Sequence, residues 1–281
     1  MYELRFPSAT LAPYVENFWF VSSTAASPVD LKVDVFVDAR ADLVFNFGAP
    51  YTREVIGGSV EEVSRSTFDA QRLVPIRIVQ RGAVEVAGVR FRLGGAGAFV
   101  RAPLAQWTGA TPDPAEVFGG AASALQTALR VATSTDEKAA LFDAFLVAAL
   151  HGDPSYASFA RALEAVQGRA TNVGEVAAAA GVSARQVERL FARFLGVSPR
   201  AALRVVRFQR ALGALMRDPG VSLAEVGAGA GYFDQAHFIR DFRKMTGGVP
   251  RGYRGYFPVE GPSDFAPSVV VFVQDAARRH A

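Results

Sequence analysis

The chain has 281 residues, half of them hydrophobic and a fifth charged, which is enough for two globular domains. It contains no cysteine, which excludes disulfides and thiol catalysis, and its three histidines argue against a histidine-rich metal site. Its apolar stretches are too short to span a bilayer and its N-terminus lacks the pattern of a secretion signal. We therefore expect a cytoplasmic protein with no metal, no cofactor and no membrane partner.

The net charge of +3 is unevenly divided between the two halves of the chain. Residues 1–154 carry 13 basic and 17 acidic side chains, whereas residues 155–281 carry 17 basic and 10 acidic ones. A basic half joined to an acidic half indicates a polyanionic partner for the C-terminal part alone.

Residues 2–110 are rich in β-branched and aromatic runs separated by Gly, Pro and Asp clusters, a pattern that predicts a small barrel or sandwich. A helix is expected near Leu11–Phe18. Asp34, Asp38 and Asp42 recur every four residues and are expected to face solvent. The expected strands are residues 33–37, 43–47, 74–79, 84–86 and 89–93.

From about residue 113 the periodicity becomes helical, with apolar spacings of three and four over Ala121–Val131 and Thr135–Leu150. These helices either form a dimer contact or pack on the barrel. The sequence HGDP at 151–154 marks a domain boundary. The fold class is therefore α+β, with an N-terminal domain over 1–153, an all-α domain over 155–257 and a tail over 258–281. In that tail, residues 268–273 predict a strand that adds to an N-terminal sheet edge.

The C-terminal half contains an internal repeat. Val173–Arg200 aligns with Leu223–Arg251 at ten identical positions once one residue is inserted after Gly231. Each unit reads as a short helix, a glycine turn and a second helix, which is the pattern of a helix-turn-helix. The expected caps and turn residues are Asn172 with Glu175, Gly181, Ser183 with Gln186, Ser222 with Glu225, Gly231 and Asp234.

Both second helices carry clustered positive charge at helical spacing, which is either a solvated basic face or a surface for phosphates. Its occurrence in both units favours phosphates. The clustered residues are Arg185, Arg189 and Arg193 in the first unit and Arg240, Arg243 and Lys244 in the second. Between the units, Pro199–Arg217 predicts a helix roughly 28 Å long, close to the ~34 Å between successive major grooves on one face of DNA. Its Arg204, Arg207 and Arg210 either hold phosphates or stay solvated.

This arrangement resembles the DNA-binding domain of the AraC/XylS family of bacterial transcription regulators over about Thr171–Tyr256. The segment GYFDQAHFIRDFRKMTGGVPRGYR (231–254) is similar to the family signature, and SARQVERLFARFLGVSPRAAL (183–203) to the first module. The resemblance implies a sequence-specific regulator, not an enzyme, that reads an asymmetric site in double-stranded DNA. Base contacts are implied for Ala184, Arg185, Gln186, Glu188 and Arg189, and for Gln235, Ala236, His237, Ile239 and Arg240. Alternatives are a Glu188–Arg185 ion pair and a capping or solvent role for Gln235. RNA polymerase, a small-molecule effector and a second copy of the chain are candidate partners.

The N-terminal half resembles a domain attached to a subset of these regulators, through LAPYVENFWF (11–20), DLVFNFGAPY (42–51) and GVRFRLGGAGAFV (88–100). In better-known members this half is a cupin-like barrel that binds an effector or mediates dimerisation. The implied pocket residues are Phe18, Trp19, Phe20, Phe45, Arg90 and Arg92. The competing interpretation is an aromatic core with a charged outer strand face.

Two other functions fit the sequence. The N-terminal domain could be an enzyme or a metal-binding module with the DNA-binding part as its control unit, although its acidic and histidine residues lack ligand spacing. Alternatively, the chain could be an architectural DNA binder without sequence preference, whose affinity would be dominated by a salt-dependent term.

Overall fold

A computed structural model describes residues 2–23, 29–63, 65–218, 220–250 and 269–273. Its N-terminal part contains two five-stranded sheets in which the paired strands are antiparallel. The first sheet has the order β1 (Tyr2–Arg5), β2 (Val15–Ser22), β9 (Glu85–Phe91), β4 (Asp42–Asn46) and β7 (Thr67–Asp69). The second has the order β10 (Val269–Val273), β3 (Val29–Val35), β8 (Ile76–Gly82), β5 (Tyr51–Val55) and β6 (Val60–Val63).

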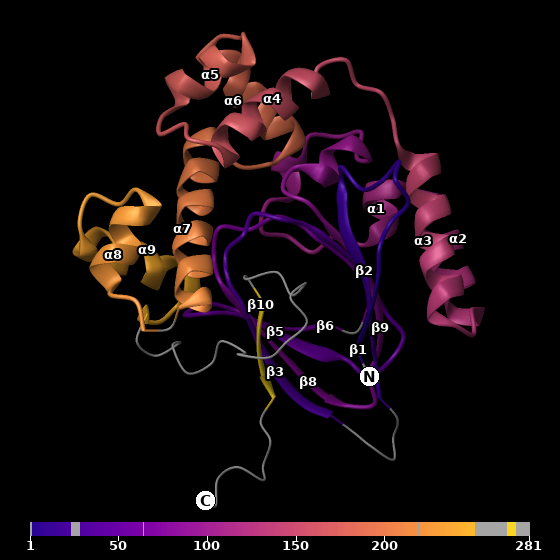
Figure 1. Ribbon diagram of the computed structural model, residues 1–281. Helices are drawn as coiled ribbons and strands as arrows, with labels where there is room; N and C mark the ends of the chain where they lie inside the picture. Colours follow the sequence, from indigo (N-terminus) through magenta and orange to yellow (C-terminus); the bar gives the residue numbers. More distant parts are fainter. Residues whose placement is uncertain (1, 24–28, 64, 219, 251–268, 274–281) are drawn as a thin grey trace, which may run out of the picture.

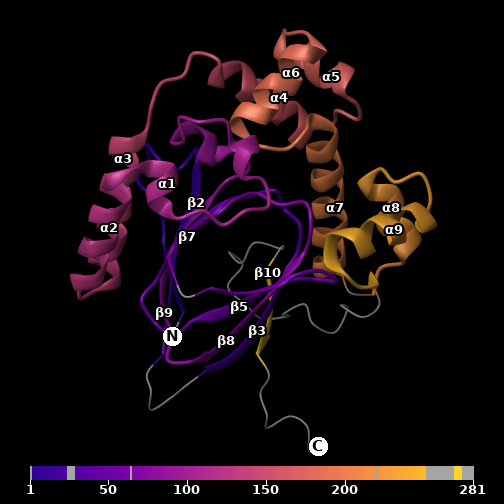
Figure 2. The same cartoon turned by 180° about the vertical axis from the view of Figure 1, so that it is seen from behind.

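Helices cover this strand domain on several sides. The helices are α1 (Pro114–Phe118), α2 (Gly120–Val131), α3 (Thr135–Ala149), α4 (Tyr156–Gln167), α5 (Val173–Ala180), α6 (Ala184–Phe194), α7 (Pro199–Arg217), α8 (Leu223–Ala230) and α9 (Gln235–Thr246), with short 3₁₀ helices at Gly95–Ala98 and Leu104–Trp107. The pair α2–α3 lies on one side and α7 to α9 on the other, with α4 to α6 at one end (Figures 1 and 2). Of the helices in the described ranges, none is long and apolar enough to cross a membrane.

The α+β architecture and both helices predicted at 121–150 are confirmed. The helix expected at Leu11–Phe18 is wrong, because residues 9–14 form turns and β2 begins at Val15. Phe18 and Phe20 of this strand are buried and Trp19 and Val21 are half-buried, so apolar side chains occupy both of its faces and the sequence lacks a clean alternation of apolar and polar residues. The two expected strands at 84–86 and 89–93 are one strand, β9.

The aspartates expected at the surface are buried instead. Asp34 is 2% exposed and receives two hydrogen bonds from Arg77, at 2.6 and 3.0 Å. Asp38 and Asp42 both pair with Arg90, which lies opposite Asp42 in the sheet register. Burial raises the pKa of Asp38, but the charges of Arg90 and Arg40 outweigh it and lower the pKa to about 2. Pairing with arginine explains how these carboxylates are accommodated away from water.

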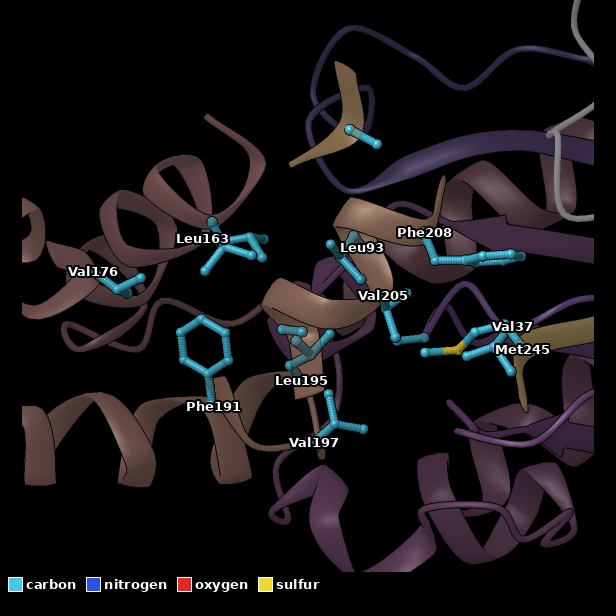
Figure 3. Close-up of a cluster of buried hydrophobic side chains, with 14 of the residues drawn as sticks. Val37, Leu93, Leu163, Val176, Phe191, Leu195, Val197, Val205, Phe208 and Met245 are labelled. Carbon is cyan, nitrogen blue, oxygen red and sulfur yellow. The ribbon is translucent and has the colours of Figure 1, made fainter. Parts of the chain in front are cut away.

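One hydrophobic core crosses the boundary expected at residues 153–155. It joins Phe36, Val37, Ala39 and Leu93 of the strand domain to residues of α4 to α9, among them Phe191, Phe208 and Met245. Figure 3 shows Val37 beside Met245 within this cluster. The strand domain and the helical part are therefore packed against each other, in addition to being linked through the chain.

The strand predicted near the C-terminus is present as β10. It pairs antiparallel with β3, from Val269 opposite Val35 to Val273 opposite Leu31, at the edge of the second sheet. Ser268, the expected boundary at 257–258, and the Arg251 and Arg254 end of the resembling segment lie outside the described residues. The backbone of the tail thus returns to the N-terminal domain, as predicted.

Candidate nucleic-acid interface

The first helix-turn-helix module consists of α5 and α6. The Asn172 side chain caps α5 by accepting from the Glu175 amide at 3.0 Å. Gly181 ends the helix with φ of 67°, a left-handed conformation that favours glycine. Ser183 and Gln186 then form a capping box at the start of α6. These are the contacts that the sequence predicted.

The second module, α8 and α9, repeats the design. Ser222 and Glu225 form a capping box on α8, and Gly231 ends that helix with φ of 85°. Asp234 caps α9 by accepting from the His237 amide at 2.6 Å. The tandem helix-turn-helix prediction is therefore confirmed in both copies.

Each second helix has a buried apolar face and an exposed polar face. In α6, Val187, Phe191 and Phe194 are buried, and in α9 Phe238, Phe242 and Met245 are buried. The predicted contact residues that are exposed are Ser183, Ala184, Arg185, Gln186, Glu188, Arg189, Asp234, Gln235, Ala236, Arg240, Arg243 and Lys244. His237 and Ile239 are half-buried. His237 lies edge-on to the Tyr232 ring at 5.1 Å, and Ile239 borders a surface hollow with Leu223 and Val249.

Several charged side chains on these helices have no intramolecular partner. Within the described residues, neither a hydrogen bond nor an ion pair engages the side chains of Arg185, Glu188, Arg189, Arg240, Arg243 and Lys244. The alternative ion pair between Glu188 and Arg185 is therefore not formed. Unpaired arginine and glutamate side chains at a helix surface remain available to base edges and phosphates.

Arg193 differs from the other cations of its predicted stripe. Its guanidinium donates to the carbonyl oxygens of Val100 and Ala102 at 3.0 and 3.1 Å, and lies 3.8 Å from the Asp153 carboxylate. It also covers the Phe194 ring. Arg193 thus joins α6 to the strand domain and is not grouped with Arg185 and Arg189. Its spacing on the helix gave no sign of this contact.

The three arginines in the middle of α7 also have partners inside the molecule. Arg204 and Arg207 both lie beside Asp241 of α9, with the closest atoms 2.9 and 3.6 Å apart. Arg207 also stacks on Tyr232 at 4.7 Å. Arg210 donates to the carbonyl oxygens of Gln167 and Gly168. These contacts fix α7 against its neighbouring helices, a role beside the two expected from the sequence.

The residues expected to line an effector pocket do not come together. Phe18, Phe20 and Phe45 pack around Phe142 of α3, at ring distances of 5.4 to 6.1 Å. Trp19 lies on the opposite face of the sheet, so close to Gly88 that a Cβ there would come within 2.2 Å of the indole. For the three phenylalanines, the structure matches the competing interpretation of an aromatic core.

The two arginines of that set are separated as well. Arg90 is buried and faces Asp38 and Asp42, which neutralise it, whereas Arg92 donates to the Ala12 carbonyl at 2.7 Å. Arg90 is therefore not available as the partner of an anionic effector in this arrangement. Among the described residues, no group of three potential ligands is placed to hold a metal ion.

A strand domain packed against two helix-turn-helix modules defines a class of DNA-binding regulators. Two family models match the chain: a helix-turn-helix domain over residues 176–256 and a domain of unknown function (DUF6597) over residues 4–113. The helix-turn-helix region of the chain is therefore of the AraC type, similar to that of bacterial transcription regulators.

Named relatives come from several bacteria. The transcriptional activator NphR of Rhodococcus sp is 30% identical over 240 residues, which are 83% of this chain and 65% of NphR. The regulator GbdR of Pseudomonas aeruginosa is 32% identical over 96 residues, which are 34% of this chain and 26% of GbdR. A solved AraC-type regulator from Chromobacterium violaceum is 26% identical, with a TM-score of 0.35, and the match covers 38% of this chain and 98% of that one. The chain therefore spans less than two thirds of the curated relatives it matches.

Proposed function

We propose that the chain is a sequence-specific transcription regulator that reads an asymmetric site in double-stranded DNA through α6 and α9. The observation that carries this proposal is the distribution of unpaired charge. In the part of the chain that the structure describes, arginines on the exposed faces of both second helices have no hydrogen-bond or ion-pair partner, whereas Arg204, Arg207 and Arg210 in the middle of the connecting helix α7 are paired inside the molecule. Charge left unpaired on these two helices fits an external polyanion.

The connecting helix sets the separation of the two modules. With 19 residues, α7 is roughly 28 Å long, which approaches the ~34 Å between major grooves on one side of the duplex. Contacts of Arg204 and Arg207 with Asp241 fix the second module on this helix. Because the two exposed faces carry different side chains, the two half-sites differ in sequence.

Individual base contacts follow from side-chain chemistry. Arg189 and Arg240 occupy the same position in the two modules and suit bidentate bonds to guanine. Glu188 suits the cytosine amino group. The side-chain oxygen of Gln186 accepts from the Ser183 amide at 2.8 Å, so its amide nitrogen is the group left for a base.

A ligand of the strand domain would modulate binding through contacts that reach the connecting helix and the second module. The Val37 amide donates to the Met245 carbonyl of α9 at 3.1 Å, and the Val37 carbonyl accepts from Gln209 of α7 at 2.6 Å. The neighbouring Asp38 is fixed by Arg90. Any ligand that displaces this segment would therefore shift α7 and α9 together.

Selection of duplexes from a random library by the full-length chain, at about 150 mM salt, tests the proposal. We expect an asymmetric motif with two half-sites about ten base pairs apart. Arg189→Ala and Arg240→Ala should each weaken binding to that motif by about 1–3 kcal/mol. Arg130→Ala, an exposed cation on α2, is the matched control and should change little. Binding without enrichment would instead support an architectural role, and unchanged affinity in both variants and their double variant would refute the assigned contacts.

A further inference from the structure

The one-residue difference between the two modules lies at Phe233. In the first module the Val182 amide donates to the Ala177 carbonyl at 3.1 Å, and in the second the Tyr232 amide donates to the equivalent Gly227 carbonyl at 2.9 Å. Tyr232 thus takes the place of Val182. The caps Ser183 and Asp234 are also equivalent, so Phe233 is the extra residue.

Phe233 has no packing role in the described structure. In the first module Val182, the residue before the cap, packs on the core, in the position of a hydrophobic staple. In the second module Tyr232 takes this role, 6% exposed and with its ring 5.3 Å from that of Phe238. Phe233 is 93% exposed, more than any other large hydrophobic side chain of the described residues.

The position of Phe233 indicates what covers it. It directly precedes Asp234, the cap of α9, and the N-terminal end of a recognition helix is the part that meets base edges in the major groove. Further along the same helix, Arg240, Arg243 and Lys244 are exposed and unpaired. Positive charge on this helix favours DNA over a protein surface as the occupant.

We propose that Phe233 contacts the 5-methyl group of a thymine in the half-site read by the second module. Phenylalanine is one of the apolar side chains that recognise this methyl group. The inference rests on the proposed function, because it requires α9 to enter the major groove. Phe233 would then contribute to the DNA sequence preference, although the alignment of the two modules shows it only as an inserted residue.

The test combines a protein change with a DNA change. Full-length wild type and Phe233→Ala are titrated by fluorescence anisotropy against the selected duplex and against the same duplex with uracil in place of each thymine of the second half-site. For wild type, we expect uracil to weaken binding about five- to tenfold, the loss of one good apolar contact. Phe233→Ala should show the same loss on the thymine duplex and no further loss on the uracil duplex.

Controls separate this contact from other effects. Phe6→Ala, at a 67% exposed phenylalanine of the strand domain, should leave both affinities unchanged. The melting temperature of Phe233→Ala should match wild type. Unchanged affinity of Phe233→Ala for the thymine duplex would overturn the inference, as expected if a protein covers this residue. An equal loss on both duplexes would also overturn it, by assigning a sugar or phosphate contact. If wild type enriches no sequence, the proposed function itself is wrong and the thymine contact with it.

Discussion

The two helix-turn-helix modules share their caps and turns but are attached to the molecule differently. The first is held by side chains that cross to or from the strand domain: Arg193 donates to Val100 and Ala102, and Thr108 donates to the Gly196 carbonyl at 2.6 Å. The second meets the strand domain through the backbone bond between Val37 and Met245 and through the close approach of Gly247 to Ile56, and Asp241 fixes it on α7. Two modules of similar sequence are therefore attached to the strand domain by different contacts.

Alanine substitutions at two equivalent, closely packed glycines should show the largest difference in stability between the two modules. Gly196 and Gly247 both have positive φ, 77° and 82°. A Cβ at Gly196 would lie 1.8 Å from the Gln71 amide nitrogen, which is buried and bonded to Leu104 and Thr108, whereas one at Gly247 would meet the half-buried Ile56 at 2.5 Å. We expect Gly196→Ala to lower the free energy of unfolding by about 3 kcal/mol, from conformational strain and overpacking together.

Gly247→Ala is the matched comparison. Its cost should be about 1–2 kcal/mol, mainly the positive-φ penalty, because Ile56 is half-buried whereas Gln71 is buried and hydrogen-bonded. Urea unfolding of both variants measures the difference. Equal costs would mean that the two modules are held with similar rigidity.

Arg193 of the first module and Lys244 of the second occupy equivalent positions in the repeat. Substituting each should distinguish a cation that holds a module on the strand domain from one that binds DNA. Arg193→Ala removes two charge-assisted hydrogen bonds to the strand domain and should lower the free energy of unfolding by about 1.5–3 kcal/mol. The salt dependence of DNA binding should stay as in wild type. Lys244→Ala should leave unfolding within about 0.5 kcal/mol of wild type but reduce the salt slope of binding by about 1.

Urea unfolding and binding titrations over a range of salt concentrations measure both effects. If Arg193→Ala reduced the salt slope as Lys244→Ala does, Arg193 would leave the strand domain when DNA binds. That result would place it back in the predicted phosphate-binding stripe.

Removing the N-caps of α6 and α9 should change the free energy of unfolding least, and by similar amounts in the two modules. Ser183→Ala and Asp234→Ala each remove a side chain that accepts from the first turn of α6 or α9, so each should lower the free energy of unfolding by about 1 kcal/mol. Ser183→Asp, which preserves the cap, should retain most of the stability. A much larger loss for one cap would show that the modules differ locally as well as in their attachment.

Features that depend on neighbouring residues were predictable from the sequence. The caps at Asn172, Ser183, Ser222 and Asp234, the turns at Gly181 and Gly231 and the connecting helix starting at Pro199 all follow from residue types a few positions apart. The helix expected at Leu11–Phe18 is wrong because β2 carries apolar side chains on both its buried and its half-buried face, and this removes the alternation of apolar and polar residues that distinguishes a strand.

The number of charged side chains in each half follows from the sequence, but the partners of those side chains do not. Spacing along a helix groups Arg193 with Arg185 and Arg189, yet the carbonyls that engage Arg193 are about ninety residues away in the chain. Spacing likewise put Asp34, Asp38 and Asp42 in solvent, although Arg77 pairs with Asp34 and Arg90 pairs with both Asp38 and Asp42. Which charges remain available to an external partner therefore depends on contacts that chain position alone does not reveal.

By itself, the sequence determined the duplicated helix-turn-helix, its caps and turns, the long connecting helix and the basic character of this half, because these depend on short-range hydrogen bonds and helical periodicity. Among the described residues, the tertiary structure decided which arginines stay unpaired, that Val37 contacts both α7 and α9, and that Phe233 is left exposed. The reason is physical: pairing and burial depend on which distant segments meet, and these segments meet only when the strand domain and the helical modules pack against each other.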